Sequence, residues 1–159
     1  MFHCIEYPAS AEECYELIAK QWDGLFDQQC DIIANAANLS ALLYHSLPDV
    51  NWVGIYRLQK DQLVLGPFQG LPACIILPYG KGVCFSAVLA RKIARVDDVL
   101  SFAGHIACDS ASRSEIVVPI YQNQQVFGVL DIDSPIQSRF TDLDEKYLQA
   151  MVTLLEKCL

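Results

Sequence analysis

The residues with the clearest chemical potential are cysteines in the stretch from Gly66 to Ser134. Cys74 and Cys84 flank the turn-forming run PYGKG, and Cys108 lies in the irregular sequence HIACD. Thiols in loops and turns are more accessible than thiols on buried helix faces, and reactivity requires both access and thiolate character. No pair has the C-x-x-C spacing of a thioredoxin-like site. The placement of these thiols in loops and turns therefore favours thiol chemistry, while their spacing argues against a thioredoxin-like site and leaves open which cysteines pair.

Carboxyl groups follow these cysteines in two neighbouring predicted strands. Alternation places Asp131 and Asp133 on one face of their strand and Glu115 on the matching face of its partner. Asp and Glu are depleted from strands, so we expect them to converge on a concave side of the sheet; the alternative is an exposed strand end. Clustered carboxylates raise one another's pKa, which lets one serve as a general acid while the others bind an ammonium group.

Other residues near these groups have weaker support. Trp52 and Tyr56 share one face of the first predicted strand and are expected to form an aromatic wall, although a single aromatic residue there is usually core. Lys81 is placed to lower the pKa of a neighbouring thiol. His105 is placed to act as a base beside Cys108, but a loop histidine more often finds backbone partners.

Metal and phosphate sites are disfavoured by spacing. The three cysteines of this stretch and His105 match no compact zinc-binding pattern. The run GKG lacks the GxxxxGK[ST] arrangement of a phosphate-binding loop. We therefore predict no bound metal and no bound cofactor.

Composition indicates one globular domain. The 159 residues are 53% hydrophobic and 19% charged, and a chain of this length buries an ordinary core. A formal net charge of −8 argues against nucleic acid and acidic membranes as partners. No apolar run approaches the roughly 20 residues of a membrane span. No signal-peptide pattern is seen, so we expect a cytoplasmic protein, in which seven cysteines are poorly explained as a disulfide framework.

Helix signals mark both ends of the chain. Ser10 and Glu13 have the spacing of a capping box, which predicts a helix from there to about Asp23. A second helix is predicted from about Gln28 to Ser46. Near the C-terminus, Thr141 caps a last helix whose first turn is acidic.

Apolar stripes predict the buried face of each helix. Cys14 and Cys30 lie within the first two stripes, so we expect both thiols to pack in the core. The stripe of the second helix comprises Cys30, Ile33, Ala34, Ala37, Ala41 and Tyr44. The stripe of the last helix comprises Leu143, Tyr147, Ala150, Met151, Leu154 and Leu155.

Between these helices the hydrophobic pattern changes to a period of two. The predicted strands are 51–58, 62–68, 93–96, 114–122 and 125–133, with 72–77 interpreted as a strand or an extended loop. A short helix is predicted at 83–92. Residues 97–112 form a predicted loop, which at that length is more often functional than not. Helices that bracket hairpin-linked strands are typical of an α+β fold.

Taken together, the motifs resemble those of a known family. The segments GPFQG, ACIILPYGKGVC, GHIACD, SEIVVPI and GVLDIDS are similar to those of free methionine-(R)-sulfoxide reductases, which are single GAF domains. GVLDIDS alone recurs across GAF domains, whereas the three cysteines in their contexts, with SEIVVPI and DIDS, are specific. The resemblance covers essentially the whole chain and implies a single GAF domain over residues 1–159. It implies a GAF-like central antiparallel sheet with N- and C-terminal helices on one face and a closed ligand pocket on the other.

The resemblance also implies a reaction. Free L-methionine-(R)-sulfoxide is reduced to L-methionine through a cysteine sulfenic acid and a disulfide. Thioredoxin, kept reduced by NADPH through thioredoxin reductase, is the implied external reductant. Cys108 matches the family nucleophile, and Cys84 and Cys74 match the resolving or recycling cysteines, in an order left open.

The same match covers the pocket. The residues matched to substrate binding are Glu115, Asp131, Asp133, Trp52 and Tyr56. Carboxylates that hold an ammonium group select a free amino acid, because the same nitrogen in a peptide is an uncharged amide. GAF domains often pair through their terminal helices, which allows a homodimer.

Two other functions fit part of the pattern. A regulatory GAF module binds a cyclic nucleotide or similar ligand, but it usually sits beside an output domain, for which this chain has no room, and it has no need of these cysteines. A thiol-based oxidant sensor needs only the cysteines. Sensor and enzyme differ in whether the disulfide forms stoichiometrically with added methionine sulfoxide or only with peroxide.

Overall fold

Residues 5–102, 104 and 110–159 are described by the computed structural model of the chain. Its strands are β1 (Trp52–Gln59), β2 (Gln62–Gly70), β3 (Ile76–Pro78), β4 (Ala94–Val96), β5 (Ser114–Gln122) and β6 (Gln125–Ser134). Its helices are α1 (Ala11–Leu25), α2 (Ile32–Ser46), α3 (Gly82–Ala90) and α4 (Asp142–Leu155), with 3-10 helices η1 (Val99–Ser101) and η2 (Glu156–Cys158). The predicted α+β class is confirmed.

The strands form one antiparallel sheet in the order β3-β2-β1-β6-β5-β4. The predicted hairpin between β5 and β6 is confirmed, and it turns at Asn123 and Gln124, which both have positive φ. Two such residues in succession match the twist that a tight hairpin needs. Residues 72–75 lie outside any strand, so of the predicted 72–77 element only its end belongs to β3.

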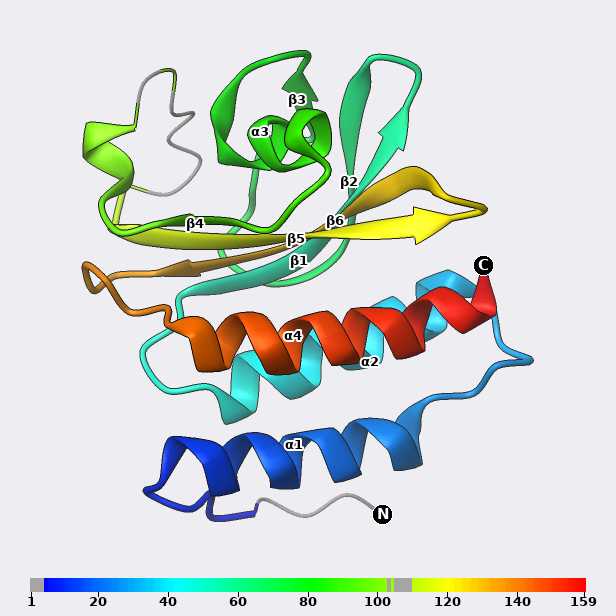
Figure 1. Ribbon diagram of the computed structural model, residues 1–159, viewed down its shortest axis with the longest axis vertical. Helices are drawn as coiled ribbons and strands as arrows, with labels where there is room; N and C mark the ends of the chain where they lie inside the picture. Colours follow the sequence, from blue (N-terminus) through cyan, green and yellow to red (C-terminus); the bar gives the residue numbers. More distant parts are fainter. Residues whose placement is uncertain (1–4, 103, 105–109) are drawn as a thin grey trace.

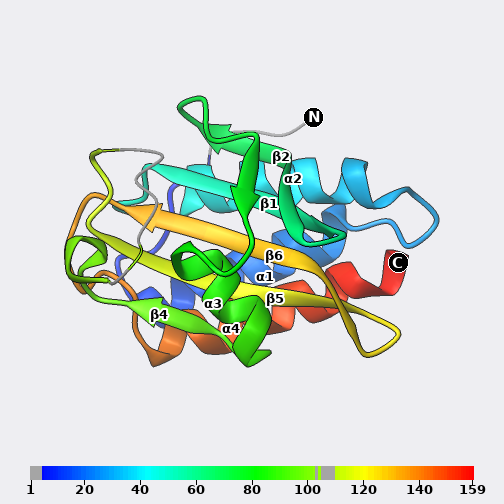
Figure 2. The ribbon, with the colours of Figure 1, turned by 90° about the horizontal axis from the view of Figure 1, so that it is seen from above.

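Helices cover the two faces of the sheet unequally. The helices α2 and α4 pack against one face with α1 outermost, and α3 lies on the other face over β5 and β6 (Figures 1 and 2). Alternation along β6 follows this division, because Leu130 and Ile132 enter the core beneath the helices while Val129 enters the core on the α3 side. One face of the sheet is thus covered by two layers of helices, and the other face is covered mainly by α3 and the loops around it (Figures 1 and 2).

Side-chain caps fix where the helices begin. The Ser10 side chain accepts a hydrogen bond from the backbone N–H of Glu13, so α1 begins where predicted. Thr141 and Asp144 form the capping box of α4. Asp31 caps α2, so this helix begins four residues later than the predicted Gln28. A good N-cap residue thus outweighs a continued apolar pattern.

The predicted buried face of α2 is wrong. Its buried residues are Asn35, Ala36, Leu39, Ser40, Leu43 and Ser46. Ile33, from the predicted stripe, is 52% exposed, and Cys30 lies in the exposed loop before the helix. The segment carries small or apolar residues nearly all round, so periodicity alone does not select one face. Cys14, by contrast, is buried in α1 as expected.

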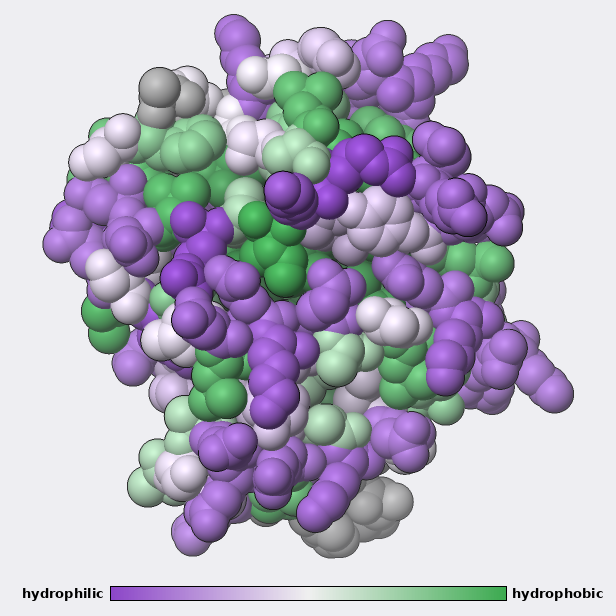
Figure 3. All heavy atoms as spheres, viewed as in Figure 1, coloured by the Kyte–Doolittle hydropathy of each residue, from purple (hydrophilic) through white to green (hydrophobic). Residues whose placement is uncertain are grey.

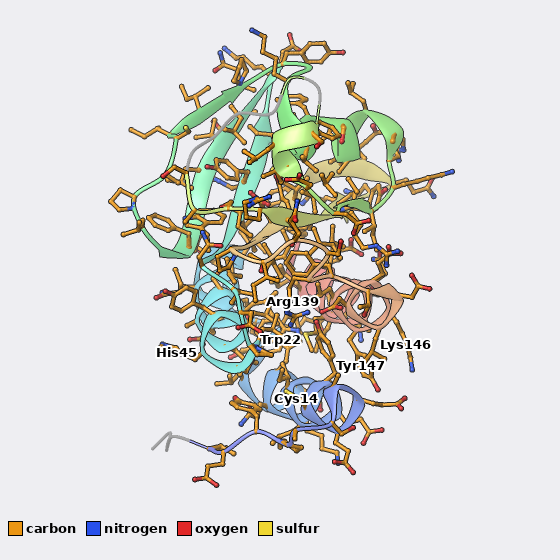
Figure 4. All side chains as sticks on the ribbon, turned by 90° about the vertical axis from the view of Figure 1, so that its left-hand side faces the viewer. Cys14, Trp22, His45, Arg139, Lys146 and Tyr147 are labelled. Atoms are coloured by element: carbon orange, nitrogen blue, oxygen red, sulfur yellow. The ribbon has the colours of Figure 1, made fainter. Side chains whose placement is uncertain are left out.

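In α4 the predicted stripe is displaced but overlaps the buried face. Met151 and Leu155 are buried as predicted, together with Leu148 and Val152, which the stripe left out. Between the helices, Trp22 reaches from α1 into the layer of α2 and α4, where its Nε1 donates to the carbonyl oxygen of Met151 at 3.0 Å (Figure 4). The helical layers are thus held by packing and by buried hydrogen bonds.

The outer surface is of mixed polarity. On the face seen in Figure 3, apolar atoms are scattered among hydrophilic ones over the helices. Scattered apolar residues of this kind are normal for a folded domain. Within the described ranges, no helix combines the length and apolarity needed to cross a membrane.

Candidate active site

The β5–β6 hairpin brings the predicted carboxyl groups together. Glu115 pairs directly with Asp133, and Val117 pairs with Asp131 two residues along the ladder. Glu115 and Asp131 are 5% and 6% exposed, and Asp133 is half-buried. The predicted strand faces are therefore confirmed, and the alternative of an exposed strand end is wrong.

The first turn of α3 adds a thiol to this cluster. Cys84 is 3% exposed, and its Sγ donates to Oε1 of Glu115 at 3.8 Å. Single ligand atoms of Cys84, Glu115 and Asp131 all lie within 4.8 Å of one another. The tight turn before α3 allows the Cys84 sulfur to come this close to the carboxyl groups, since Gly80 and Gly82 both adopt positive φ.

Two aromatic side chains form the wall predicted for the pocket. The Trp52 and Tyr56 rings stack with centroids 5.8 Å apart. Trp52 Nε1 donates to the carbonyl of Leu71 at 3.1 Å, and the Tyr56 hydroxyl donates to the carbonyl of Cys74 at 3.0 Å. These bonds fix the chain between β2 and β3 against the wall. Gly54 lies between the two aromatics, where an added Cβ would come within 2.3 Å of the Trp52 ring.

These groups line one pocket on the α3 side of the sheet. It contains Cys84 and every carboxylate and aromatic residue assigned to substrate binding from the sequence. The pocket is also lined by residues that the sequence did not indicate, among them Leu71, Pro72, Ala73, Leu77, Val83 and Ser112. Most are apolar residues without a chemical signature, and the hydrogen bonds from Trp52 and Tyr56 to the backbone at Leu71 and Cys74 explain why the segment lies there.

Burial dominates the electrostatics of the pocket. It raises the pKa of Glu115 well above its ordinary value, and the nearby Asp131 and Asp133 raise it further. Burial also raises the pKa of Asp131 to about 6, against hydrogen bonds with Cys84 and Glu115 that lower it. A buried carboxyl group beside another carboxylate holds its proton to a higher pH than an exposed one, and Glu115 is the group in that position.

The Cys84 thiol behaves in the same way. Burial raises its pKa well above the ordinary value, and Asp131 and Glu115 add to the rise. The lowering of a thiol pKa expected from Lys81 is therefore not seen at Cys84, because burial and carboxylates outweigh a cation at the pocket edge. A thiol that keeps its proton is a weak nucleophile.

The remaining predicted groups divide into two kinds. Cys74 is half-buried beside the pocket and disulfide-bonded. Cys108 and His105 lie outside the described residues, so the assignment of Cys108 as nucleophile stays a prediction. Of the described cysteines, Cys14 and Cys84 are free and buried, and neither Cys30 nor Cys158 lines the pocket.

Comparison with known proteins identifies a domain family and relatives that agree with it. The GAF domain model matches residues 24–159. The free methionine-R-sulfoxide reductase of Escherichia coli (strain K12) is 50% identical over 147 residues, covering 92% of this chain and 89% of that protein. The corresponding protein of Saccharomyces cerevisiae is 39% identical, covering 92% of this chain and 86% of its own length.

A solved structure extends the likeness to three dimensions. The free methionine-R-sulfoxide reductase of Neisseria meningitidis, in complex with its substrate, superposes with a TM-score of 0.91 at 38% identity, covering 99% of this chain and 95% of that one. Similarity at this level covers nearly the whole length of both chains.

Proposed function

We propose that this chain, which belongs to the free methionine-(R)-sulfoxide reductase family of GAF domains, reduces free L-methionine-(R)-sulfoxide to L-methionine. The observation that carries the proposal is the buried cluster of Cys84, Glu115 and Asp131 behind an aromatic wall. The relatives from Escherichia coli and Neisseria meningitidis are named for this activity, and the latter is solved with its substrate. In this proposal, residues 1–159 act as a single GAF domain.

Two features of the pocket suit a free amino acid with an apolar side chain. Carboxylates at Asp131 and Asp133 attract the ammonium group of a free amino acid by charge-assisted hydrogen bonds. Trp52 and Tyr56 provide an apolar surface for its side chain. A pocket that requires an ammonium group excludes methionine sulfoxide within a peptide, where that nitrogen is an amide.

The first chemical step transfers the sulfoxide oxygen to a cysteine. The thiolate of Cys108 attacks the sulfoxide sulfur, and a protonated carboxyl group donates to the oxygen. Methionine leaves, and Cys108 becomes a sulfenic acid, the reversible first stage of thiol oxidation. The raised pKa of Glu115 supports this residue as the acid. The raised pKa of the Cys84 thiol supports a different cysteine as nucleophile.

The second stage restores the thiols. A thiol of Cys84 or Cys74 condenses with the sulfenic acid, which releases water and forms a disulfide. Thioredoxin then reduces the disulfide by thiol–disulfide exchange. The disulfide at Cys74 supports its participation in this cycle.

A protein reductant has accessible apolar surface to contact here. Leu71, Ile75 and Tyr79 are 64%, 71% and 59% exposed, and they lie on either side of Cys74 in sequence. The proposed location is the cytoplasm, where thioredoxin keeps thiols reduced. Pairing through the terminal helices into a homodimer is part of the same proposal.

Separated epimers of free methionine sulfoxide test this function directly. In an assay that couples thioredoxin to NADPH oxidation, the R epimer should be turned over. The S epimer and a blocked methionine sulfoxide peptide should not. Absence of turnover on both epimers, with thiols titrated as reduced, would favour a ligand-binding GAF module instead.

A further inference from the structure

One acceptor oxygen in the cluster of Cys84, Glu115 and Asp131 lacks a hydrogen bond within the described structure. The carboxyl group of Asp131 interacts with Cys84 and Glu115, but its buried Oδ1 has no hydrogen-bond partner among the described residues. Asp131 itself is only 6% exposed, and a buried acceptor without a partner is uncommon and costly. The orphaned oxygen belongs to the same cluster as the Cys84 sulfur and a Glu115 oxygen. A group that binds all three would satisfy it.

We propose that the reduced protein binds a thiophilic divalent cation, of which Zn²⁺ is the representative, through Cys84, Glu115 and Asp131. Sulfur and carboxylate oxygen are both established zinc ligands, and three protein ligands leave a fourth position for water. Only Cys84 also belongs to the set of cysteines and histidine whose spacing argued against zinc; here Glu115 and Asp131 are its partners. That the ion competes with methionine sulfoxide rests on the proposed function; that it binds does not.

The distances suit a tetrahedral ion. Zinc–sulfur and zinc–oxygen bonds of about 2.3 and 2.1 Å place sulfur and oxygen ligands about 3.6 Å apart. Sγ of Cys84 lies 3.8 Å from Oε1 of Glu115. No pair in the cluster exceeds 4.8 Å, so side-chain adjustments of about 1 Å bring all three ligands into place.

Charge and ligand type select the class of ion. Ionised together, one thiolate and two carboxylates carry three negative charges in a buried site, which a divalent cation largely neutralises. The thiolate distinguishes the ions, because Mg²⁺ and Ca²⁺ prefer sites made only of oxygen. A disulfide at Cys84 would remove the thiolate, so binding requires Cys84 as a free thiol, which is its state in the described structure.

Metal titration of the reduced protein, freed of reductant under nitrogen, tests the site. Zn²⁺ is titrated against a chromogenic chelator with wild type, Cys84→Ser and Asp131→Asn. Loss of an outer partner already costs about 10- to 100-fold in metal affinity, so each variant should bind at least about tenfold more weakly. The matched control Cys30→Ser removes an exposed thiol and should stay within about twofold of wild type.

A cobalt absorption spectrum and circular dichroism distinguish loss of the site from loss of the fold. Bound Co²⁺ should give a sulfur-to-cobalt charge-transfer band that Cys84→Ser lacks, and circular dichroism confirms that each variant is folded. Wild-type affinity in Cys84→Ser, or an equal loss in Cys30→Ser, would overturn the site. Zn²⁺ should raise the KM for methionine sulfoxide without changing kcat. If the protein turned over no sulfoxide, the titration alone would still decide the metal site.

Discussion

Glu115 and Asp131 show how a pocket is made reactive at the expense of stability. Both carboxyl groups are nearly fully buried, and burial raises both pKa values. A raised pKa means that the folded protein holds a proton that the unfolded chain has already lost. The free energy of unfolding therefore falls as pH rises through the interval between the two pKa values. Catalytic carboxyl groups commonly carry this penalty.

Asp131→Asn removes a buried ionisable group, so the variant should be more stable than wild type at pH values where Asp131 is ionised. The pKa of Asp131 rises from 3.8 to about 6, which corresponds to about 3 kcal/mol lost above pH 6. At pH 8 the variant should melt about 6 °C above wild type or more, whereas at pH 4 the two should differ little. Thermal melts across this range measure the difference.

The exposed Asp61→Asn provides the control for that comparison, because its side chain lies in the turn between β1 and β2. Its melting temperature relative to wild type should not vary with pH. A variant Asp131→Asn that melts below wild type at pH 8 would contradict the account.

Helix α4 is held in place by one buried carboxylate. Asp144 accepts hydrogen bonds from the Tyr15 hydroxyl of α1 at 2.6 Å and from the Thr141 backbone at 2.7 Å. It also pairs with Arg139 at 3.0 Å. Burial alone would raise its pKa, but hydrogen bonds from Tyr15 and Thr141, together with Arg139, hold the pKa of Asp144 below its ordinary value. One residue thus begins α4 and joins it to α1.

Asp144→Ala should destabilise the protein without disturbing the pocket. Removing one member of a buried pair costs about 3–5 kcal/mol, which lowers the melting temperature by about 6 °C or more. Asp142→Ala, two residues earlier, removes an exposed surface pair with Arg95 and should cost less than about 1 kcal/mol. Equal losses in the two variants, measured by urea unfolding, would contradict this role for Asp144.

The sequence predicted elements with strong local signals and missed those decided by packing. The β5–β6 hairpin follows from alternation on both sides of Asn123, and the carboxyl cluster follows from the same alternation. The buried face of α2 was wrong because an Ala-rich helix has no single apolar side, and only the sheet selects one. Gly54 gave no signal, since its role depends on a ring from a neighbouring residue in space.

For the whole molecule, function depends on one sheet serving two purposes. Its helical face supplies stability, and its α3 face supplies the pocket together with the segment that carries Cys74. Leu71, Ile75 and Tyr79 are exposed apolar residues near Cys74, and in the proposed function they form the contact surface for the protein reductant. Reductant contact and stability are therefore separable by mutation.

Ile75→Ser should impair reduction by thioredoxin while leaving reduction by dithiothreitol unchanged. Loss of an apolar contact at an interface costs about 1–2 kcal/mol, so the KM for thioredoxin should rise by about fivefold or more. Ile33→Ser, which changes an exposed residue of α2, should alter neither assay. A fall in both assays with Ile75→Ser would indicate a general defect instead of a lost contact.

In the proposed function, sulfoxide reduction and thiol oxidation are one reaction, and a single turnover without reductant tests this directly. Fully reduced protein is mixed with excess free methionine-(R)-sulfoxide, and both methionine formed and thiols remaining are counted. We predict one methionine per chain with the loss of two thiols, and neither change in Cys108→Ser. Thiol loss with peroxide but not with the sulfoxide would contradict the account and identify an oxidant sensor.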